Sequence, residues 1–208
     1  MPDNTNYIVA IAGPVGGGKT SLVNGIAATL KDSMPIFFDH YEQITAKSME
    51  SIRKWMQEGT VVDEFSVPQL TVDLQRLKRG ESIRHPQTQL LTPASKYVLF
   101  ETPFGRLHRA TAEQIDLMVW IDTPLDIALA RKSRELVGIF LNERPLATDR
   151  DSLAWLHGYF SNYVEAIGSL LKLQQNRVGS QADVVVDGQL SQEELIPTTI
   201  QAIKHRLP

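Results

Sequence analysis

The sequence predicts an α/β fold in which five mostly parallel strands form a doubly wound sheet with helices on both faces. Short apolar runs typical of buried strands alternate with longer segments of helical periodicity through the 208 residues. A glycine-rich segment separates the first strand from the first helix, and acidic residues stand at the ends of several later strands. We expect one domain over residues 1–208, with a small lid around residues 131–150.

Local patterns predict the individual elements. The expected strands are residues 7–12, 34–38, 97–101, 116–122 and 182–187. The expected helices are residues 20–30, 44–58, 68–78, 124–137, 151–177 and a last helix capped by Ser191. Between Gly80 and Ala94, prolines and polar residues predict a loop or weak strands, where we expect substrate contacts.

The segment after the first strand fits the phosphate-loop pattern of a glycine, four residues and then Gly-Lys-Thr. It reads Gly13-Pro14-Val15-Gly16-Gly17-Gly18-Lys19-Thr20, followed by Ser21. Glycines let backbone N–H groups wrap a polyphosphate, Lys19 would reach its terminal phosphates, and the Thr20 hydroxyl would ligate Mg²⁺. The alternative is a glycine-rich turn without a ligand, but the flanking strand and helix favour phosphate binding. We therefore expect residues 13–21 to bind ATP with Mg²⁺.

Acidic residues end predicted strands at the edge where open α/β sheets bind ligands. Asp39 could accept a proton from a substrate hydroxyl and help to hold the metal, or it could be a helix cap or a solvated acid. Glu101 could orient Mg²⁺ directly or through water, or it could simply face solvent. Asp122 competes for that role, although the Thr-Pro sequence after it favours a helix N-cap.

Cationic side chains cluster in the helix expected after the fourth strand. Arg131, Lys132 and Arg134 could neutralise charge on a transferring phosphoryl group, and we take Arg131 and Arg134 as the catalytic candidates. The alternative is a favourable interaction with the C-terminal half of the helix dipole. Arg144 and Arg150 are weaker candidates in the following loop.

Tyr41 and His85 are candidates for substrate binding, because Tyr41 follows the second strand and His85 lies in the variable loop. His40, beside Asp39, is a further candidate, and each histidine could instead be an exposed loop residue. The five histidines show no spacing typical of metal ligands. Core packing is the expected role of the three tryptophans, Trp55, Trp120 and Trp155.

Composition excludes several classes of protein. The net charge of −3 argues against a general nucleic-acid binder, and the lack of cysteine excludes disulfides, thiolate catalysis and cysteine-ligated clusters. No stretch approaches the roughly 18 apolar residues that a membrane span needs. We expect a cytoplasmic protein that binds a small-molecule acceptor, with no nucleic-acid or membrane partner. No apolar stripe demands a second subunit, and homo-oligomerisation stays open.

Beyond the phosphate loop, several short segments follow one another along the chain in an order that can be compared with known families. They are Phe38-Asp39-His40-Tyr41, Phe100-Glu101, residues 119–123 with 129–135, and Tyr159 with residues 182–186. In this order and spacing, most of the chain resembles the uridine kinase and phosphoribulokinase family of phosphate-loop kinases. The resemblance implies that Asp39 is the general base and that Thr20, Asp39 and Glu101 surround Mg²⁺.

The departures from that family fall on the acceptor side. The family's uridine-contacting Tyr-Asp element, followed by a His and an Arg, has no clear match in residues 84–89. Ala128 stands where an arginine is expected, and Gly158 stands where a glutamine is expected. The resemblance therefore implies a retained phosphoryl-transfer machinery with a changed acceptor pocket.

Together these observations predict an ATP-dependent kinase acting on a hydroxyl of a nucleoside or another small polar metabolite. A nucleotide-dependent switch or regulatory ATPase is one alternative, and a relative that binds nucleotide without catalysis is another. The sequence lacks both the Asn/Thr-Lys-x-Asp element of GTPases and a Leu-Ser-Gly-Gly-Gln-like segment of transporter ATPases, which favours the kinase. The choice between ATP and GTP stays open.

Overall fold

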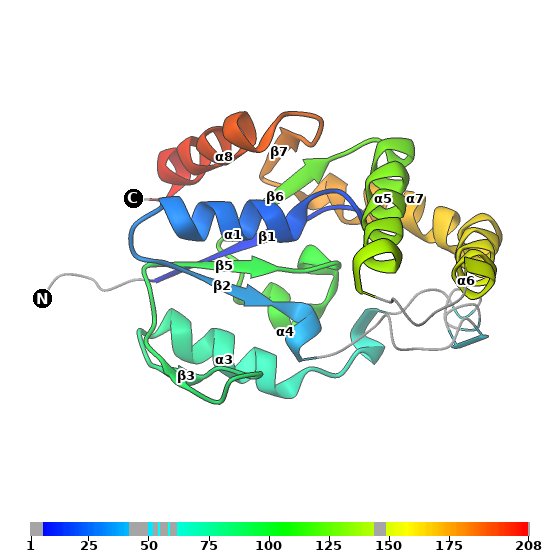
Figure 1. The fold of residues 1–208 in the computed structure, drawn as a ribbon. Coiled ribbons are helices and arrows are strands. Elements are labelled where there is room, and N and C mark those ends of the chain that lie inside the picture. Colours follow the sequence, from blue (N-terminus) through cyan, green and yellow to red (C-terminus); the bar gives the residue numbers. More distant parts are fainter. Residues whose placement is uncertain are drawn as a thin grey trace, which may run out of the picture.

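The computed structural model describes residues 6–41, 50, 51, 54, 58, 62–143 and 149–207. In this part of the chain, five parallel strands form one sheet in the order β2-β5-β1-β6-β7 (Figure 1). The strands are β1 (Tyr7–Ala12), β2 (Ser33–Phe37), β5 (Tyr97–Glu101), β6 (Leu117–Asp122) and β7 (Val184–Asp187). The predicted α/β fold with a five-stranded parallel sheet is therefore confirmed.

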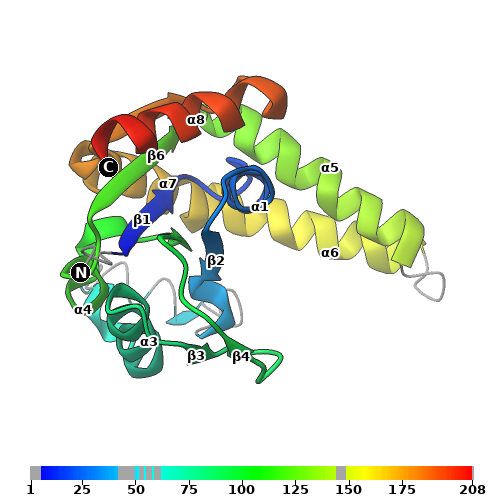
Figure 2. The ribbon, with the colours of Figure 1, turned by 90° about the vertical axis from the view of Figure 1, so that its left-hand side faces the viewer.

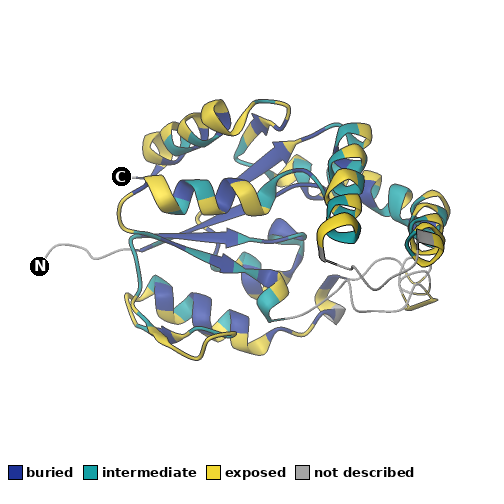
Figure 3. Cartoon of the chain, viewed as in Figure 1, coloured by how far each residue is buried: buried dark blue, intermediate teal, exposed yellow. Residues whose placement is uncertain are grey.

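Helices cover both faces of this sheet (Figure 1). The helices α1 (Lys19–Thr29) and α8 (Gln192–Arg206) lie on one face, and α3 (Pro68–Lys78) and α4 (Arg109–Ala112) lie on the other. Alternate side chains of β1 enter different cores, with Ile8 and Ala10 on the α3 side and Val9 and Ile11 on the α1 side. Figure 3 shows the sheet buried between the two helical layers. Burial on both sides explains why β1 is a continuous apolar run.

The register of the strands brings their carboxyl ends together. Ile11 of β1 and Phe37 of β2 both lie opposite Glu101, the last residue of β5. The phosphate loop follows β1, and the short helix η1 (Phe38–His40) follows β2. These segments and Glu101 therefore meet at one edge of the sheet, where α/β proteins bind ligands.

A small hairpin stands between α3 and β5. Its strands, β3 (Ile83–Arg84) and β4 (Leu91–Thr92), are antiparallel and confirm the weak strands expected in this region. The turn includes Gln89 at a φ of 59°, and the Gln89 side chain donates to the carbonyl of Pro86 at 2.8 Å. The other short elements are η3 (Val62–Glu64), η4 (Gly105–Leu107) and η6 (Gly179–Gln181).

Two long helices form an arm that projects from the sheet (Figure 2). They are α5 (Leu125–Glu143) and α6 (Asp149–Asn162), and α6 continues through the π-helical turn η5 (Tyr163–Ile167) into α7 (Gly168–Arg177). The long helical stretch is confirmed, but the expected end of α5 near Val137 is wrong. The helix continues because Phe140 packs against Trp155 of α6, with 5.3 Å between ring centroids.

The arm leaves large apolar side chains in solvent. The exposed fractions are 78% for Leu141 and 66% for Leu153, and 82% for Val164 in the adjoining turn η5. Trp155 is 45% exposed, so its expected core position is wrong, because the arm stands away from the sheet; Trp120 is buried as expected. The exposed residues do not by themselves demand a second subunit, so the expectation about an apolar stripe stays a prediction.

The remaining elements agree with the patterns where the structure describes them. Within the helix expected at 44–58, residues 50, 51 and 54 are helical and residue 58 is in a turn. The other residues of that helix, including Trp55, lie outside the described residues. Ser191 caps α8, since its hydroxyl accepts a hydrogen bond from the Glu194 amide and the Glu194 side chain accepts one from the Ser191 amide. Among the described helices, none combines the length and apolar character needed to cross a bilayer.

Candidate functional site

The phosphate loop is shaped by its backbone. Gly16 and Gly18 have φ values of 79° and 95°, a conformation that residues with a Cβ rarely adopt. The Gly17 amide donates to the Pro14 carbonyl at 2.9 Å, and the Leu22 amide donates to the Gly18 carbonyl at 2.9 Å where α1 begins. The loop therefore opens directly onto the first turn of α1, and N–H groups at the start of a helix are suited to bind phosphate.

Neighbouring elements hold this loop in place. The buried Thr123, which follows β6, donates through its hydroxyl to the Gly17 carbonyl at 3.1 Å. A Cβ at Gly16 would collide with the carbonyl group of Ala128 on α5. The loop thus depends on the close approach of the β6–α5 segment as well as on its own glycines.

Thr20 and Glu101 form a hydroxyl and carboxylate pair beside the loop. The Thr20 Oγ1 donates to Glu101, with 3.0 Å to Oε2 and 3.2 Å to Oε1. Burial raises the pKa of Glu101, while the charge of Lys19 and the hydrogen bond from Thr20 oppose that shift. Hydroxyl and carboxylate oxygens are ligands that Mg²⁺ prefers, and substrate phosphates and water usually complete such sites. The pair therefore fits Mg²⁺ bound together with nucleotide phosphates.

Lys19 stands at the start of α1, and its Nζ donates to the Pro14 carbonyl at 3.1 Å. Burial lowers the pKa of Lys19; the charges of Glu101 and Asp39 raise it, and that of Lys132 lowers it further. A bound polyphosphate would favour the charged form of Lys19. These mutual charge effects place the four side chains in one electrostatic environment.

Asp39 lies in η1 and is open to solvent at the carboxyl edge. Burial of part of its carboxyl group raises the pKa of Asp39, and the charges of Lys19 and His40 oppose that shift. The carboxylate is therefore a stronger base than an ordinary aspartate. This position and basicity suit proton transfer from a hydroxyl that approaches the phosphate loop.

Tyr41 connects η1 to α3. Its hydroxyl donates to Oδ2 of Asp73 at 2.9 Å, and Gln69 donates to Oδ1 of the same carboxylate at 2.8 Å. Burial and the hydrogen bond to Asp73 raise the pKa of Tyr41, so the hydroxyl stays protonated and keeps donating. The partly buried Tyr41 packs against the core on the α3 side of the sheet, and its substrate contact expected from the sequence stays a prediction.

The two histidine candidates lie together. The rings of His40 and His85 are 5.7 Å apart between centroids, and the ring of Phe37 lies 4.9 Å from that of His40. His40 follows the candidate base directly, whereas His85 comes from the β3–β4 hairpin. The hairpin thus reaches the edge that carries Asp39.

The cations of α5 occupy different positions. Arg131 donates to the Gly188 carbonyl in the β7–α8 turn at 2.8 Å, and Arg134 is exposed. Lys132 lies close to the loop, since a Cβ added at Gly16 would be 3.3 Å from the Cβ of Lys132. The Lys132 Nζ forms an ion pair with Glu135 at 2.6 Å. Arg150 is exposed on α6, and Arg144 lies outside the described residues.

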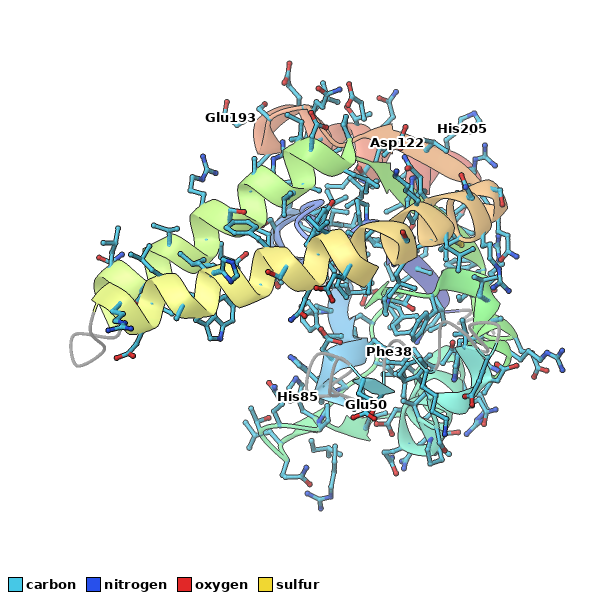
Figure 4. The ribbon with its side chains drawn as sticks, turned by 90° about the vertical axis from the view of Figure 1, so that its right-hand side faces the viewer. Phe38, Glu50, His85, Asp122, Glu193 and His205 are labelled. Atoms are coloured by element: carbon cyan, nitrogen blue, oxygen red, sulfur yellow. The ribbon has the colours of Figure 1, made fainter. Side chains whose placement is uncertain are left out.

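Asp122 lies apart from the histidine pair (Figure 4). Its Oδ1 accepts hydrogen bonds from Gln175 of α7 at 3.1 Å and from Trp120 Nε1 at 3.5 Å. Its carboxylate therefore joins the end of β6 to α7. The described residues contain no group of three histidine, cysteine, aspartate or glutamate side chains placed to hold a metal ion.

Sequence reasoning missed two supporting residues, Asp73 and Thr123. Asp73 lies on the buried stripe of α3 between Leu70 and Leu74, and a carboxylate in an apolar stripe was a usable signal of a polar partner. Thr123 gave no comparable signal, because its bond to the Gly17 carbonyl joins residues far apart in the sequence.

Comparison with known proteins supports the fold. No protein-family model matches the sequence, and no curated protein matches it. The solved structures that resemble it include shikimate kinase from Acinetobacter baumannii in complex with shikimate, at 19% identity and a TM-score of 0.53, with 99% of this chain and 97% of that chain covered. They also include a possible uridine kinase from Bacillus stearothermophilus, at 14% identity and a TM-score of 0.50, with 88% and 89% covered. The chain therefore shares the fold of phosphate-loop small-molecule kinases.

Proposed function

We propose that the protein is an ATP-dependent kinase that transfers the γ-phosphoryl group of ATP to a hydroxyl of a small polar acceptor. The observation that carries this proposal is the convergence of the phosphate loop and Asp39 at one edge of the sheet. Lys19 of the loop influences the pKa of Asp39, and Thr20 hydrogen-bonds Glu101. A carboxylate of raised pKa beside a phosphate loop is the group that transfer to a hydroxyl needs.

The proposed reaction assigns a role to each of these groups. The backbone N–H groups of residues 13–21, apart from Pro14, which has none, and the Lys19 ammonium bind the β- and γ-phosphates. Thr20, Glu101 and Asp39 would hold Mg²⁺, which when bound neutralises phosphate charge. Asp39 takes the proton of the acceptor hydroxyl as its oxygen bonds to the γ-phosphorus and the bond to the bridging oxygen of ADP breaks.

A cation from α5 would stabilise the charge on the transferring phosphoryl group. Of the three cations named from the sequence, Arg131 and Arg134 are the favoured ones, but the closeness of Lys132 to Gly16 supports Lys132. Closure of the arm over the nucleotide would bring one of the three onto the phosphates. We therefore propose the arm as the lid of a single kinase domain, with Lys132 as the first cation to test.

The experiment is ADP release from Mg-ATP, measured without an acceptor and with nucleosides, sugar phosphates and pantothenate-like alcohols. The proposal expects one acceptor to raise the rate well above background and to appear as its phosphorylated form by mass spectrometry. Equal rates with every acceptor, together with normal ATP binding, would favour a switch or a catalytically inactive relative. A parallel series with Mg-GTP decides between the two nucleotides.

We also propose that the protein works in the cytoplasm and that the exposed apolar residues of the arm support a homo-oligomer. Leu141 and Leu153, on the two helices of the arm, are the residues to test. Light scattering of the purified chain should give the mass of an oligomer, and Leu141→Ser should lower it. A monomer mass at all concentrations would reject the oligomer without affecting the kinase proposal.

A further inference from the structure

Asp73 is a buried carboxylate that the proposed transfer chemistry does not use. It lies on the inner face of α3, and its exposed fraction is 2%. Its two hydrogen-bond donors are uncharged, since the Tyr41 hydroxyl reaches Oδ2 at 2.9 Å and the Gln69 amide reaches Oδ1 at 2.8 Å. No lysine or arginine in the described part of the chain forms an ion pair with it. A buried carboxylate without a paired cation lowers the stability of a fold, so its presence here points to a role other than packing.

The helix α3 gives Asp73 a fixed support. Leu70, Leu74 and Leu77 of the same helix are fully buried and belong to the core on this side of the sheet. The side chain of Asn6 also holds the helix, because its Nδ2 donates to the Leu77 carbonyl at 2.8 Å. A group that is hydrogen-bonded to Asp73 is therefore held to the core of the protein.

The Tyr41 end of this hydrogen bond belongs to the turn that carries Asp39. The Tyr41 amide donates to the Phe38 carbonyl at 2.9 Å and closes η1, with Asp39 inside the turn. The buried Phe38 packs edge-on against the ring of Phe104, with 5.4 Å between the ring centroids. Asp39 therefore lies between two anchors, which are the buried ring of Phe38 and the hydrogen-bonded hydroxyl of Tyr41.

We propose that Asp73 is a positioning residue for the candidate base, because its hydrogen bond to Tyr41 fixes the end of η1 and thereby the place of the Asp39 carboxylate. A carboxylate suits this role, since it accepts from two donors at once and a charged acceptor forms the stronger hydrogen bond. A general base must lie within hydrogen-bond reach of the proton that it takes, so a small displacement of η1 lowers the rate. This inference rests on the proposed function, since the place of Asp39 affects the rate only if Asp39 acts as the base.

The alternative is a purely structural role, in which Asp73 only helps to hold α3. The hydrogen bond from Asn6 to the Leu77 carbonyl is the matched case, because Asn6 is also buried and its bond ends on α3 about one helical turn beyond Asp73. Asn6→Ala should therefore lower the unfolding free energy without changing η1. Variants at these two places on α3 separate an effect on stability from an effect on the position of the base.

The first measurement compares kcat with the acceptor identified by ADP release, and ATP affinity is measured on the same preparations. Tyr41→Phe and Asp73→Ala should each lower kcat by about threefold, and the double variant should be no slower than either, because both changes remove the same hydrogen bond. Asp73→Asn keeps an oxygen that accepts from Tyr41, so its kcat should stay near that of the wild type. ATP affinity should be unchanged in all of these variants, and Asn6→Ala should turn over at the wild-type rate.

The second measurement needs no acceptor. The amide of residue 41 donates within η1, so its hydrogen exchange reports how often the turn opens. Exchange should be about fivefold faster in Tyr41→Phe and Asp73→Ala, which corresponds to about 1 kcal/mol for one hydrogen bond. It should be unchanged in Asp73→Asn and Asn6→Ala. If Asp73→Ala does not fold, Tyr41→Phe and Asp73→Asn give the same comparison.

The outcomes distinguish this inference from the proposed function. The inference is wrong if Asn6→Ala slows turnover and speeds exchange as much as Tyr41→Phe does, or if Tyr41→Phe changes neither. Faster exchange in Tyr41→Phe with unchanged kcat would also overturn it, because the hydrogen bond to Asp73 would then be structural alone. Faster exchange in a protein without any acceptor-dependent turnover would reject the proposed kinase, and with it the catalytic role, but would keep Asp73 as the residue that orders η1.

Discussion

The nucleotide side and the acceptor side of the sheet edge are built in different ways. On the nucleotide side the loop is defined by backbone, with Gly16 and Gly18 at positive φ and the Gly17 carbonyl held by Thr123. On the acceptor side the site is defined by side chains from separate segments, such as His40 of η1 and His85 of a hairpin with two-residue strands. A backbone site tolerates few substitutions, whereas a side-chain site can change its ligand without changing the fold.

Replacement of Lys19 should have the largest effect. Lys19→Ala removes the charge at the phosphate loop and should abolish detectable turnover, because no other group of the loop supplies a cation to the terminal phosphates. The measurement is acceptor-dependent ADP release, with circular dichroism to confirm folding. Turnover near the wild-type rate would show that the loop does not bind the reacting phosphates.

Asp39 joins the two sides and should give the next effect. Asp39→Asn should preserve ATP binding and lower kcat by about 10²-fold or more, in the range of a lost general base. Rate and affinity measured on the same preparation separate the two effects. An Asp39→Asn protein with unchanged kcat would remove Asp39 from the chemistry.

The pH profile tests the same residue independently. Asp39 acts as a base only when ionised, so kcat/KM should fall as the pH drops through the pKa of Asp39. Because burial raises that pKa, the fall should begin at higher pH than for an ordinary aspartate. The acidic limb should disappear from the residual activity of Asp39→Asn, and a limb of unchanged position in that variant would assign it to another group.

Gly16→Ala tests the backbone character of the nucleotide side. A Cβ at this position meets the Ala128 carbonyl group and the backbone has a φ of 79°, so we expect ATP affinity to fall by about tenfold or more. Gly138→Ala is the matched control on α5, because a Cβ there has no neighbour within 4 Å. The control should bind ATP normally and gain about 0.5–1 kcal/mol in unfolding free energy. Equal ATP affinity in the two variants would contradict the proposed close packing.

The cations of the arm should have smaller effects that can be ranked. Lys132→Ala should lower kcat by about tenfold, as expected for the loss of one charge near the transferring group. Arg131→Ala also loses the bond to the Gly188 carbonyl, so its unfolding free energy should fall as well. Arg134 is exposed, so Arg134→Ala shows the effect of removing a charge alone. If Arg134→Ala lowers kcat most, the lid closes with a different face toward the phosphates.

Tyr41→Phe should have the smallest effect on activity, and this effect should be limited to the acceptor side. The change removes the hydroxyl bound to the buried Asp73, and we expect a loss of about 1–3 kcal/mol in unfolding free energy, measured with urea. KM for the acceptor should rise, while ATP affinity stays unchanged. A weaker affinity for ATP would mean that η1 also supports the nucleotide side.

The difference between a nucleotide side defined by backbone and an acceptor side defined by side chains also explains which features the sequence could predict. The phosphate loop, the acid that ends β5 at Glu101, the acid that closely follows β2 at Asp39, and the Ser191 cap follow from patterns of a few adjacent residues. The contact of His40 with His85 depends on how the hairpin folds back, and no local pattern reports it. The exposure of Trp155 also escaped prediction, because an apolar helical pattern does not show whether a helix packs on the sheet or on another helix.

The most direct test of the account follows the γ-phosphoryl group itself. ATP labelled in that group is incubated with the protein, Mg²⁺ and the acceptor identified by ADP release, and the label is divided between phosphorylated acceptor and free phosphate. The account predicts that most of the label reaches the acceptor and that Asp39→Asn slows this transfer. Release of the label only as free phosphate, at a rate independent of the acceptor, would contradict it.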